Sequence, residues 1–242
     1  MRGSGIMKDV NTPSIRDTLG LEDAFATYVF DESRVDLSGW NSTHAFFRAL
    51  LEEFKPKLIL ELGVWKGMSS LHMAVQSKKL GLGTEIVAID TWLGSSAHLS
   101  SKGRRAELSP RNGYPTLYET FLANVHSKGM QDVIIPLPMD GNSAAYALKR
   151  LGVKADMIHI DASHEYDACL NDFRNYWDLL ADDGVLLCDD YGIWAEVSRA
   201  VCQFAAEVNR PVWTSMAKAI ICKDPSVGFD LTLTKRRKIK VL

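Results

Sequence analysis

Three features that would assign the chain to a common class are missing. No apolar run approaches the roughly 18 residues of a membrane-spanning helix. The N-terminal residues MRGSGIMKDV lack the apolar centre of a signal peptide. The 28 Lys and Arg residues nearly balance the 30 Asp and Glu residues, so the net charge is −2 and nucleic acid would not be strongly attracted. We therefore expect a cytoplasmic protein without nucleic-acid or membrane partners.

Cysteine is also scarce, and its spacing excludes the usual metal chemistry of thiols. The four cysteines, Cys169, Cys188, Cys202 and Cys222, form no CxxC pair, so a zinc site is not expected. Cys188 and Cys222 lie in apolar runs typical of buried strands. Free, buried thiols fit a reducing compartment.

Two common nucleotide-binding motifs are missing as well. The chain contains no P-loop GK[ST] and no GxGxxG. In the segment LILELGVWKGMSS, the second residue after Gly63 is Trp65, whose bulk would fill the approach of a pyrophosphate. A dinucleotide-dependent oxidoreductase is therefore disfavoured.

From residue 57 onward, strand-like and helix-like segments alternate. The strand-like segments are continuously apolar, which is typical of parallel strands buried on both faces by helices. Right-handed crossovers then give a doubly wound sheet. We predict an α/β, Rossmann-like fold with a mostly parallel seven-stranded sheet. The predicted strands are 57–62, 85–90, 133–140, 155–161, 185–191, 212–216 and 218–222.

The remaining segments are predicted to surround this domain. Residues 57–225 form the catalytic domain, preceded by an N-terminal helical extension at 8–56 and followed by a strand and basic tail at 226–242. Residues 1–7 read as an artificial leader. The insert at 91–115 is long enough for a lid or binding loop, and a solvated loop is the alternative. The extension is expected to fold over the pocket or to contact a second copy in a homo-oligomer.

Acidic residues stand at nearly every predicted strand end. In a doubly wound sheet, ligands bind at the carboxyl ends of the strands. Because like charges repel, a purely structural protein has no reason to collect carboxylates on one edge. These acids are Glu61, Asp90, Asp140, Asp161, Asp189 and Asp190.

The first strand end predicts a cofactor. Gly63 and Gly67 allow positive φ and close ligand approach, although a tight turn without ligand explains them equally well. Asp90 can accept hydrogen bonds from both hydroxyls of a ribose. Glu61 suits a cationic ligand end, or the network that holds it. A ribose and a positively charged amino-acid end without phosphates describe S-adenosylmethionine.

The fourth and fifth strand ends predict a metal. Asp161 ends one strand, and Asp189 and Asp190 end the next. Three converging carboxylates need a cation, and oxygen-only ligands favour magnesium or calcium. Magnesium would lower the pKa of a bound hydroxyl and fix its angle to the methyl group. The alternative is that Asp189 or Asp190 caps the following helix near Gly192.

Three aromatic or imidazole side chains accompany these acids. His164 follows Asp161 by three residues and is the candidate general base, with a surface or packing role as the alternative. His159 lies inside an apolar strand and is predicted to be a satisfied core histidine. Trp92 is expected either to lie over an adenine ring or to fill the core.

Four segments together carry a family resemblance: ELGVWKGMSS, VAIDTW, IHIDASHEYDACLNDF and GVLLCDDYG. They resemble class I methyltransferases, most closely the metal-dependent O-methyltransferases grouped with the macrolide-sugar enzymes. The resemblance covers roughly residues 55–225. It implies that Glu61, Gly63 and Gly67 frame the cofactor methionine and that Asp90 holds the ribose.

The same resemblance assigns further roles. Asp140 and Ser143 would contact the adenine, and Asp161, Asp189 and Asp190 would bind the metal, with Asp161 also serving the cofactor and catalysis. The expected function is a magnesium-assisted, S-adenosylmethionine-dependent O-methyltransferase acting on a small hydroxylated molecule of sugar or natural-product type. The alternatives are a metal-independent O- or N-methyltransferase with His164 as base, and a non-catalytic nucleoside-binding member of the fold.

Overall fold

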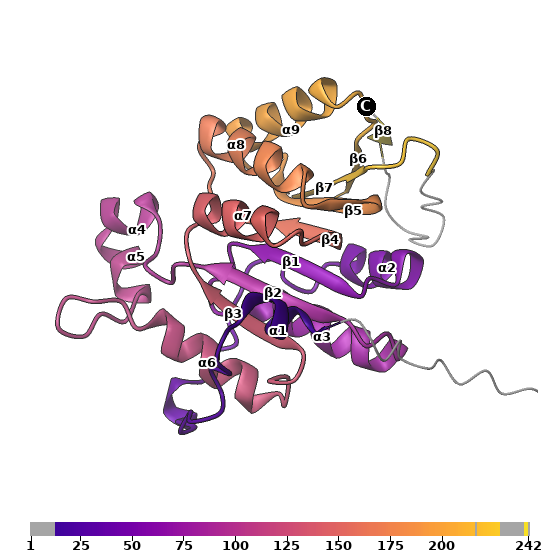
Figure 1. The fold of residues 1–242 in the computed structure, drawn as a ribbon. Helices are drawn as coiled ribbons and strands as arrows, with labels where there is room; N and C mark the ends of the chain where they lie inside the picture. Colours follow the sequence, from indigo (N-terminus) through magenta and orange to yellow (C-terminus); the bar gives the residue numbers. More distant parts are fainter. Residues whose placement is uncertain (1–12, 216, 228–239, 242) are drawn as a thin grey trace, which may run out of the picture.

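The computed structural model describes residues 13–215, 217–227 and 240–241. The expected leader at 1–7 and most of the tail at 226–242 lie outside the described residues. One eight-stranded sheet crosses the molecule in the order β3-β2-β1-β4-β5-β7-β6-β8 (Figure 1). Among the described residues, no helix combines the length and apolar character needed to span a membrane.

The strands confirm the predicted doubly wound sheet. Neighbouring strands among β1 to β5 are parallel, whereas β7 runs antiparallel to both β5 and β6. All seven predicted strands are present, and a two-residue strand extends the sheet. Their bounds are β1 Leu58–Leu62, β2 Glu85–Asp90, β3 Ile134–Pro138, β4 Ala155–Ile160, β5 Leu180–Tyr191, β6 Trp213–Ser215, β7 Ala217–Cys222 and β8 Lys240–Val241.

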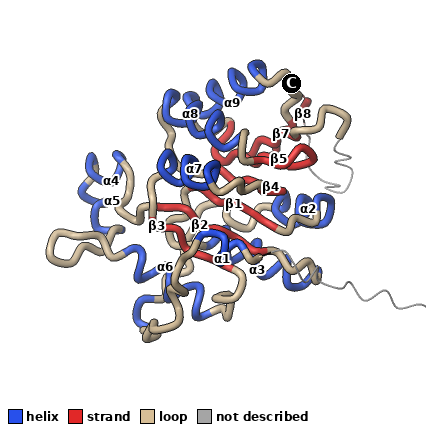
Figure 2. Tube along the Cα trace, viewed as in Figure 1, coloured by secondary structure: helices blue, strands red, loops and turns tan. Residues whose placement is uncertain are grey.

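Helices cover both faces of the sheet (Figure 2). One core cluster joins α1, α7, α8 and α9 to the sheet, and the other joins α2, α3 and α6 to the opposite face. Because side chains alternate along a strand, β1 sends Leu60 and Leu62 to the first cluster and Ile59 to the second. The helices are α1 Ile15–Leu19, α2 Ala45–Phe54, α3 Met68–Leu80, α4 Ser96–Ser100, α5 Lys102–Glu107, α6 Leu117–Ser127, α7 Gly141–Arg150, α8 Tyr166–Trp177 and α9 Ala195–Glu207, with a 3-10 turn η1 at Glu32–Arg34.

The N-terminal extension before α2 is mostly loop, and the insert contains two short helices. Between residue 13 and α2, the extension contains only the five-residue α1 and the three-residue η1, so it is mostly loop. The insert at 91–115 contains the two short helices α4 and α5.

Backbone hydrogen bonds align the strand ends that were expected to form the site. The amide of Asp161 donates to Leu62 O at 2.8 Å, and the amide of Gly63 donates to Ile89 O at 3.0 Å. These bonds join the ends of β4, β1 and β2 beyond the strands themselves. The acids at those ends therefore belong to one edge of the sheet.

Candidate functional site

Asp90, at the end of β2, holds the turn that follows β1. Its Oδ2 accepts hydrogen bonds from the amides of Val64 at 2.8 Å and Trp65 at 2.9 Å, and its Oδ1 accepts from the amide of Trp92 at 2.8 Å. Each carboxylate oxygen can accept two hydrogen bonds. Oδ1 therefore retains capacity for a ligand hydroxyl while Asp90 fixes the turn.

Both glycines of the turn have positive φ, +82° at Gly63 and +86° at Gly67. A Cβ at Gly63 would lie 2.5 Å from the carbonyl carbon of Asp161 and 2.7 Å from Cα of Ala162. A Cβ at Gly67 would lie 2.8 Å from Cδ2 of Phe121. The structure thus supports the tight-turn explanation for both glycines.

The aromatic residues at this turn have structural partners. Trp65 has φ of +54°, and its ring stacks on His98 of the insert with centroids 4.8 Å apart. Trp40, from the extension, lies beside the same ring at 5.8 Å. Trp92 is only 2% exposed, packs against aromatic side chains of α6 and donates from Nε1 to Trp65 O at 2.9 Å. Of the two roles open for Trp92, the structure supports core packing.

Asp140 caps α7. Its Oδ1 accepts from the amides of Asn142 at 3.1 Å and Ser143 at 3.0 Å, and these hydrogen bonds, those of Ser143 first, lower the pKa of Asp140. Asp140 and Ser143 are both exposed. The Asp140 carboxylate therefore has a local structural role, which leaves Ser143 as the better candidate for an adenine contact.

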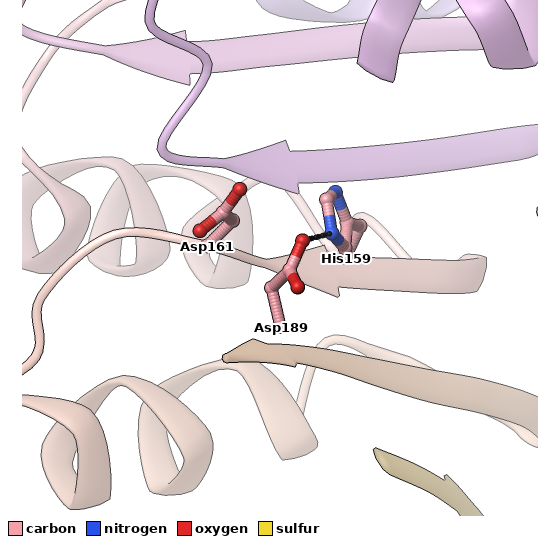
Figure 3. A group of neighbouring side chains, drawn as sticks. All are labelled: His159, Asp161 and Asp189. Atoms are coloured by element: carbon pink, nitrogen blue, oxygen red, sulfur yellow. Dashed lines mark ion pairs between the residues drawn. The ribbon is translucent and has the colours of Figure 1, made fainter. Parts of the chain in front are cut away.

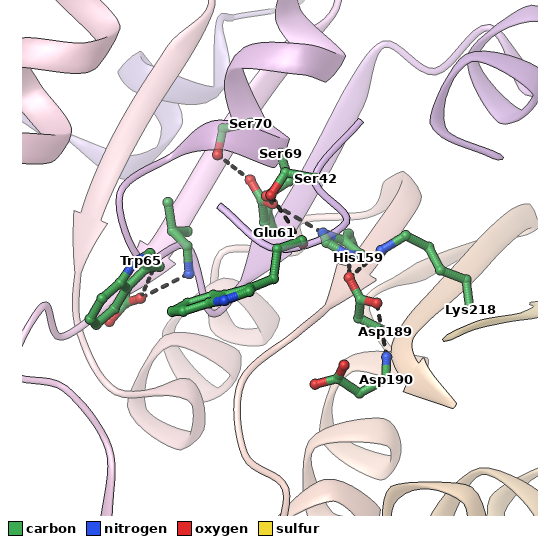
Figure 4. A network of polar contacts seen from close by, with 12 residues as sticks. Ser42, Glu61, Trp65, Ser69, Ser70, His159, Asp189, Asp190 and Lys218 are labelled. Atoms are coloured by element: carbon green, nitrogen blue, oxygen red, sulfur yellow. Dashed lines mark hydrogen bonds and ion pairs between the residues drawn. The ribbon is translucent and has the colours of Figure 1, made fainter. Parts of the chain in front are cut away.

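Four charged side chains form a row across one buried face of the sheet (Figure 4), which we call the buried charge row. Its members come from four neighbouring strands: Glu61 on β1, His159 on β4, Asp189 on β5 and Lys218 on β7. Glu61 is fully buried, accepts hydrogen bonds from Ser69 and Ser70, and its Oε1 lies 3.0 Å from Nδ1 of His159. Glu61 therefore belongs to the network behind the turn.

Asp189 joins the two cations of the row. Its Oδ2 lies 3.6 Å from Nε2 of His159 (Figure 3) and accepts from Nζ of Lys218. Lys218 is 0% exposed, and its ammonium also lies over the ring of Phe47 from α2, 4.9 Å from the centroid. The sequence analysis did not single out Lys218. Its signal was a charged residue within an apolar strand, where lysine is almost never buried unless paired.

The pKa values follow from these contacts. Burial lowers the pKa of His159, but the neighbouring carboxylates of Asp189 and Glu61 outweigh it and raise the pKa to about 9. Burial raises the pKa of Asp189, but His159 and Lys218 lower it to about 2. Burial, and then repulsion by Asp189, raises the pKa of Asp161 to about 7. At neutral pH His159 is therefore a cation and Asp189 an anion, so these two neighbours in the row carry opposite charges.

A second, more exposed group lies at the same edge. Nε2 of His164 lies 2.9 Å from Oδ2 of Asp190, and the His164 ring stacks on Trp194 with centroids 4.8 Å apart and planes 7° apart. The hydrogen bond to Asp190 raises the pKa of His164. Asp161, His164 and Asp190 all line one small cavity.

The predicted metal ligands are divided between two groups that share Asp161. Within each group, one ligand atom per residue lies within 4.8 Å of the others. The groups are His159, Asp161 and Asp189, and Asp161, His164 and Asp190. The structure therefore brings the three predicted acids to one edge but surrounds them with histidines and a lysine.

Seven strands follow the order β3-β2-β1-β4-β5-β7-β6, and among these seven only β7 is reversed. Together with an acid at the end of β2, this order defines the class I methyltransferase fold. A family model described as a methyltransferase domain matches residues 60–191, more than half of the chain. The chain belongs to this methyltransferase family. Its activity is S-adenosylmethionine-dependent methyl transfer.

Solved structures show the same fold at low sequence identity. An O-methyltransferase from Bacillus cereus in complex with SAH has a TM-score of 0.53 and 14% identity, over 78% of this chain and 83% of that chain. TomG from Streptomyces achromogenes, an O-methyltransferase involved in tomaymycin synthesis and solved with SAM, has a TM-score of 0.54 and 14% identity, over 77% and 82%. The O-methyltransferase NovP has a TM-score of 0.55 and 16% identity, over 74% and 78%. No curated protein sequence matches the chain significantly.

Proposed function

We propose that this methyltransferase acts on a hydroxyl oxygen of a small molecule of sugar or natural-product type. The observation that carries the proposal is the pair of His164 and Asp190 beside a small cavity at the carboxyl edge of the sheet. An oxygen acceptor must lose its proton during transfer, and a positioned histidine can receive it. The names of the similar structures, O-methyltransferases that include TomG, favour oxygen over nitrogen as the acceptor atom.

The residues that follow the first three strands fit S-adenosylmethionine. Gly63 and Gly67 form the turn, Asp90 has acceptor capacity left on Oδ1, and Ser143 is exposed at the start of α7. We propose that these residues hold the cofactor and that Glu61 acts through the network behind the turn. When bound, the cofactor supplies an electrophilic methyl group.

His164 is proposed as the general base. Asp190 lies against Nε2 of the imidazole, which leaves Nδ1 to receive the proton from the acceptor hydroxyl. The carboxylate of Asp190 stabilises the imidazolium that forms, and the stacked Trp194 fixes the plane of the ring. Because Asp190 raises the pKa of His164, the neutral, proton-accepting form of the imidazole becomes abundant only at a higher pH than in a free histidine.

Magnesium assistance at Asp161, Asp189 and Asp190 is the second candidate. The residues fit a cation only in part. Oδ1 of Asp189 accepts from the amide of Asp190 at 2.8 Å, and Oδ2 is bonded to Lys218, so both oxygens already have partners within the protein. The grouping of Asp161 with Asp190 is the observation that supports this candidate.

A methyl-transfer assay tests the proposal. Purified protein with methyl-labelled S-adenosylmethionine is given hydroxylated sugars, phenols and matching amines, with and without a chelator. We expect label on hydroxyl acceptors in chelator. His164→Gln should reduce kcat by about 100-fold or more with cofactor affinity unchanged, whereas His126→Gln, a change on α6, should have no effect.

Each other result has a defined meaning. Transfer to amines alone would contradict the acceptor class. Loss of activity in chelator with recovery in magnesium would move the second candidate to first place. Full activity of His164→Gln would remove the histidine from the mechanism.

A further inference from the structure

The ammonium of Lys218 lies against the carboxylate of Asp189, where a metal ion bound by Asp189 would have to lie. The side chain is completely buried, and its ammonium contacts the carboxylate of Asp189 and the ring of Phe47. β7 runs antiparallel to β5, with Ala219 opposite Cys188 and Ala217 opposite Tyr191, so the start of β7 lies beside the end of β5. The pairing of these two strands therefore brings a fixed positive charge to the acidic edge of the sheet.

We propose that Lys218 is a built-in counter-ion that takes the place of a divalent cation at Asp189 and closes this carboxylate to metal. The inference rests on the proposed function only for the location of the site. Metal binding is measured without acceptor or cofactor, so either idea can fail without the other.

Three neighbouring carboxylates repel one another, and this repulsion is the reason to expect a metal. In the buried charge row, His159 lies between the carboxylates of Glu61 and Asp189, and Lys218 lies against Asp189. The row is therefore neutralised by the protein itself, with one cation for each of its two acids.

A divalent ion could bind Oδ2 of Asp189 only by displacing the ammonium of Lys218, which is 0% exposed. Breaking a buried pair leaves an uncompensated charge away from water and is strongly unfavourable. Oδ1 is engaged as well, because it accepts from the amide of Asp190. Lys218 therefore holds Oδ2 of Asp189, and its positive charge beside Oδ1 opposes the approach of a metal ion to the remaining acceptor site.

The contacts also make Lys218 a positioning residue. Lys218 fixes Asp189, Asp189 fixes the amide of Asp190, and the carboxylate of Asp190 fixes His164. Loss of Lys218 should therefore disturb the proposed base through two intervening residues while leaving the cofactor turn in place.

The test measures Mn²⁺ binding to chelator-treated protein by electron paramagnetic resonance, with calorimetric titration of Mg²⁺. The native protein should show no site tighter than about 1 mM, and Lys218→Met should bind Mn²⁺ at least about 100-fold more tightly because Asp189 is released. Lys218→Gln keeps a hydrogen-bond donor to Asp189 and should show a smaller gain, and it serves if the Met variant does not fold.

Two controls isolate the cause. Lys223→Met removes a partly buried lysine just after β7 that donates to Trp177 O and Leu180 O, and it should bind no additional metal. The double change of Lys218→Met with Asp189→Asn should lose the gain, since the carboxylate is gone. In the transfer assay, Lys218→Arg should retain the pH profile of the native protein, whereas Lys218→Met should shift it.

Two results would overturn the inference. One is a native protein that binds a single Mn²⁺ at micromolar concentration. The other is a folded Lys218→Met variant whose Mn²⁺ affinity equals that of the native protein.

Discussion

Gly63→Ala should destabilise the protein far more than a glycine change with the same backbone conformation elsewhere. Gly63 has φ of +82°, a region that costs an L-residue roughly 1–2 kcal/mol. The added Cβ would also lie 2.5 Å from the carbonyl carbon of Asp161 and 2.7 Å from Cα of Ala162. These are backbone atoms, so β1 and β4 would have to separate at their ends, and overpacking of this kind adds about 1–3 kcal/mol. The expected loss is about 2–5 kcal/mol.

Gly81→Ala is the matched control. Gly81 has φ of +67° and nothing within 4 Å of an added Cβ, so only the backbone conformation contributes. Urea denaturation of the native protein and both variants gives the free energies of unfolding, and equal m-values show that the transitions are comparable. We expect Gly63→Ala to lose at least about 1 kcal/mol more than Gly81→Ala.

The refuting result is equally clear. If both variants lose the same free energy of unfolding, within about 0.5 kcal/mol, the close approach at the ends of β1 and β4 does not contribute to the cost of the Gly63 substitution. The glycine would then be explained by its backbone conformation alone.

Two further predictions concern the cofactor and the buried charge row. Asp90→Ala leaves three backbone amides without their acceptor. S-adenosylmethionine should therefore bind about 100-fold more weakly, and the free energy of unfolding should fall by about 1–3 kcal/mol. Unchanged affinity in a calorimetric titration would contradict the role of Asp90. The pKa of His159 is raised from 6.5 to about 9, so its contribution to stability is complete below pH 6.5 and is lost as the pH rises through 9. Melting temperatures should therefore fall more steeply over this range in the native protein than in His159→Gln, and parallel curves would show that the histidine is not held charged.

The sequence was sufficient for the sheet and for the location of the acids. Parallel strands buried on both faces have continuous apolar stretches, and five such stretches correspond to β1 to β5, while two shorter stretches correspond to β6 and β7. Because parallel strands end at the same edge, Asp90, Asp161 and Asp189 could be assigned to one site before any contact was known.

The partners of these acids could not be predicted in the same way. Lys218 reaches Asp189 only because β7 is reversed and inserts between β5 and β6, a long-range pairing that local pattern does not reveal. Trp92 had two open roles because an aromatic residue after a strand suits either a ligand face or a core. The decision depends on α6, which packs against it from a distant part of the chain.

His159 shows both the strength and the limit of the sequence argument. Its burial was predicted correctly from its place in an apolar strand, and it is 0% exposed. Its position between Glu61 and Asp189 depends on the register of β1 against β4, where Glu61 pairs with His159. The histidine is therefore a core residue that also links the turn to the acidic edge.

The most direct test of the account is a calorimetric titration of the purified protein with S-adenosylmethionine, S-adenosylhomocysteine and NAD. The account predicts that both sulfur nucleosides bind at micromolar concentration, that NAD does not bind, and that Asp90→Ala removes most of the affinity. Absence of binding by either sulfur nucleoside, or binding of NAD, would contradict the assignment of the turn at Gly63, Gly67 and Asp90 to S-adenosylmethionine.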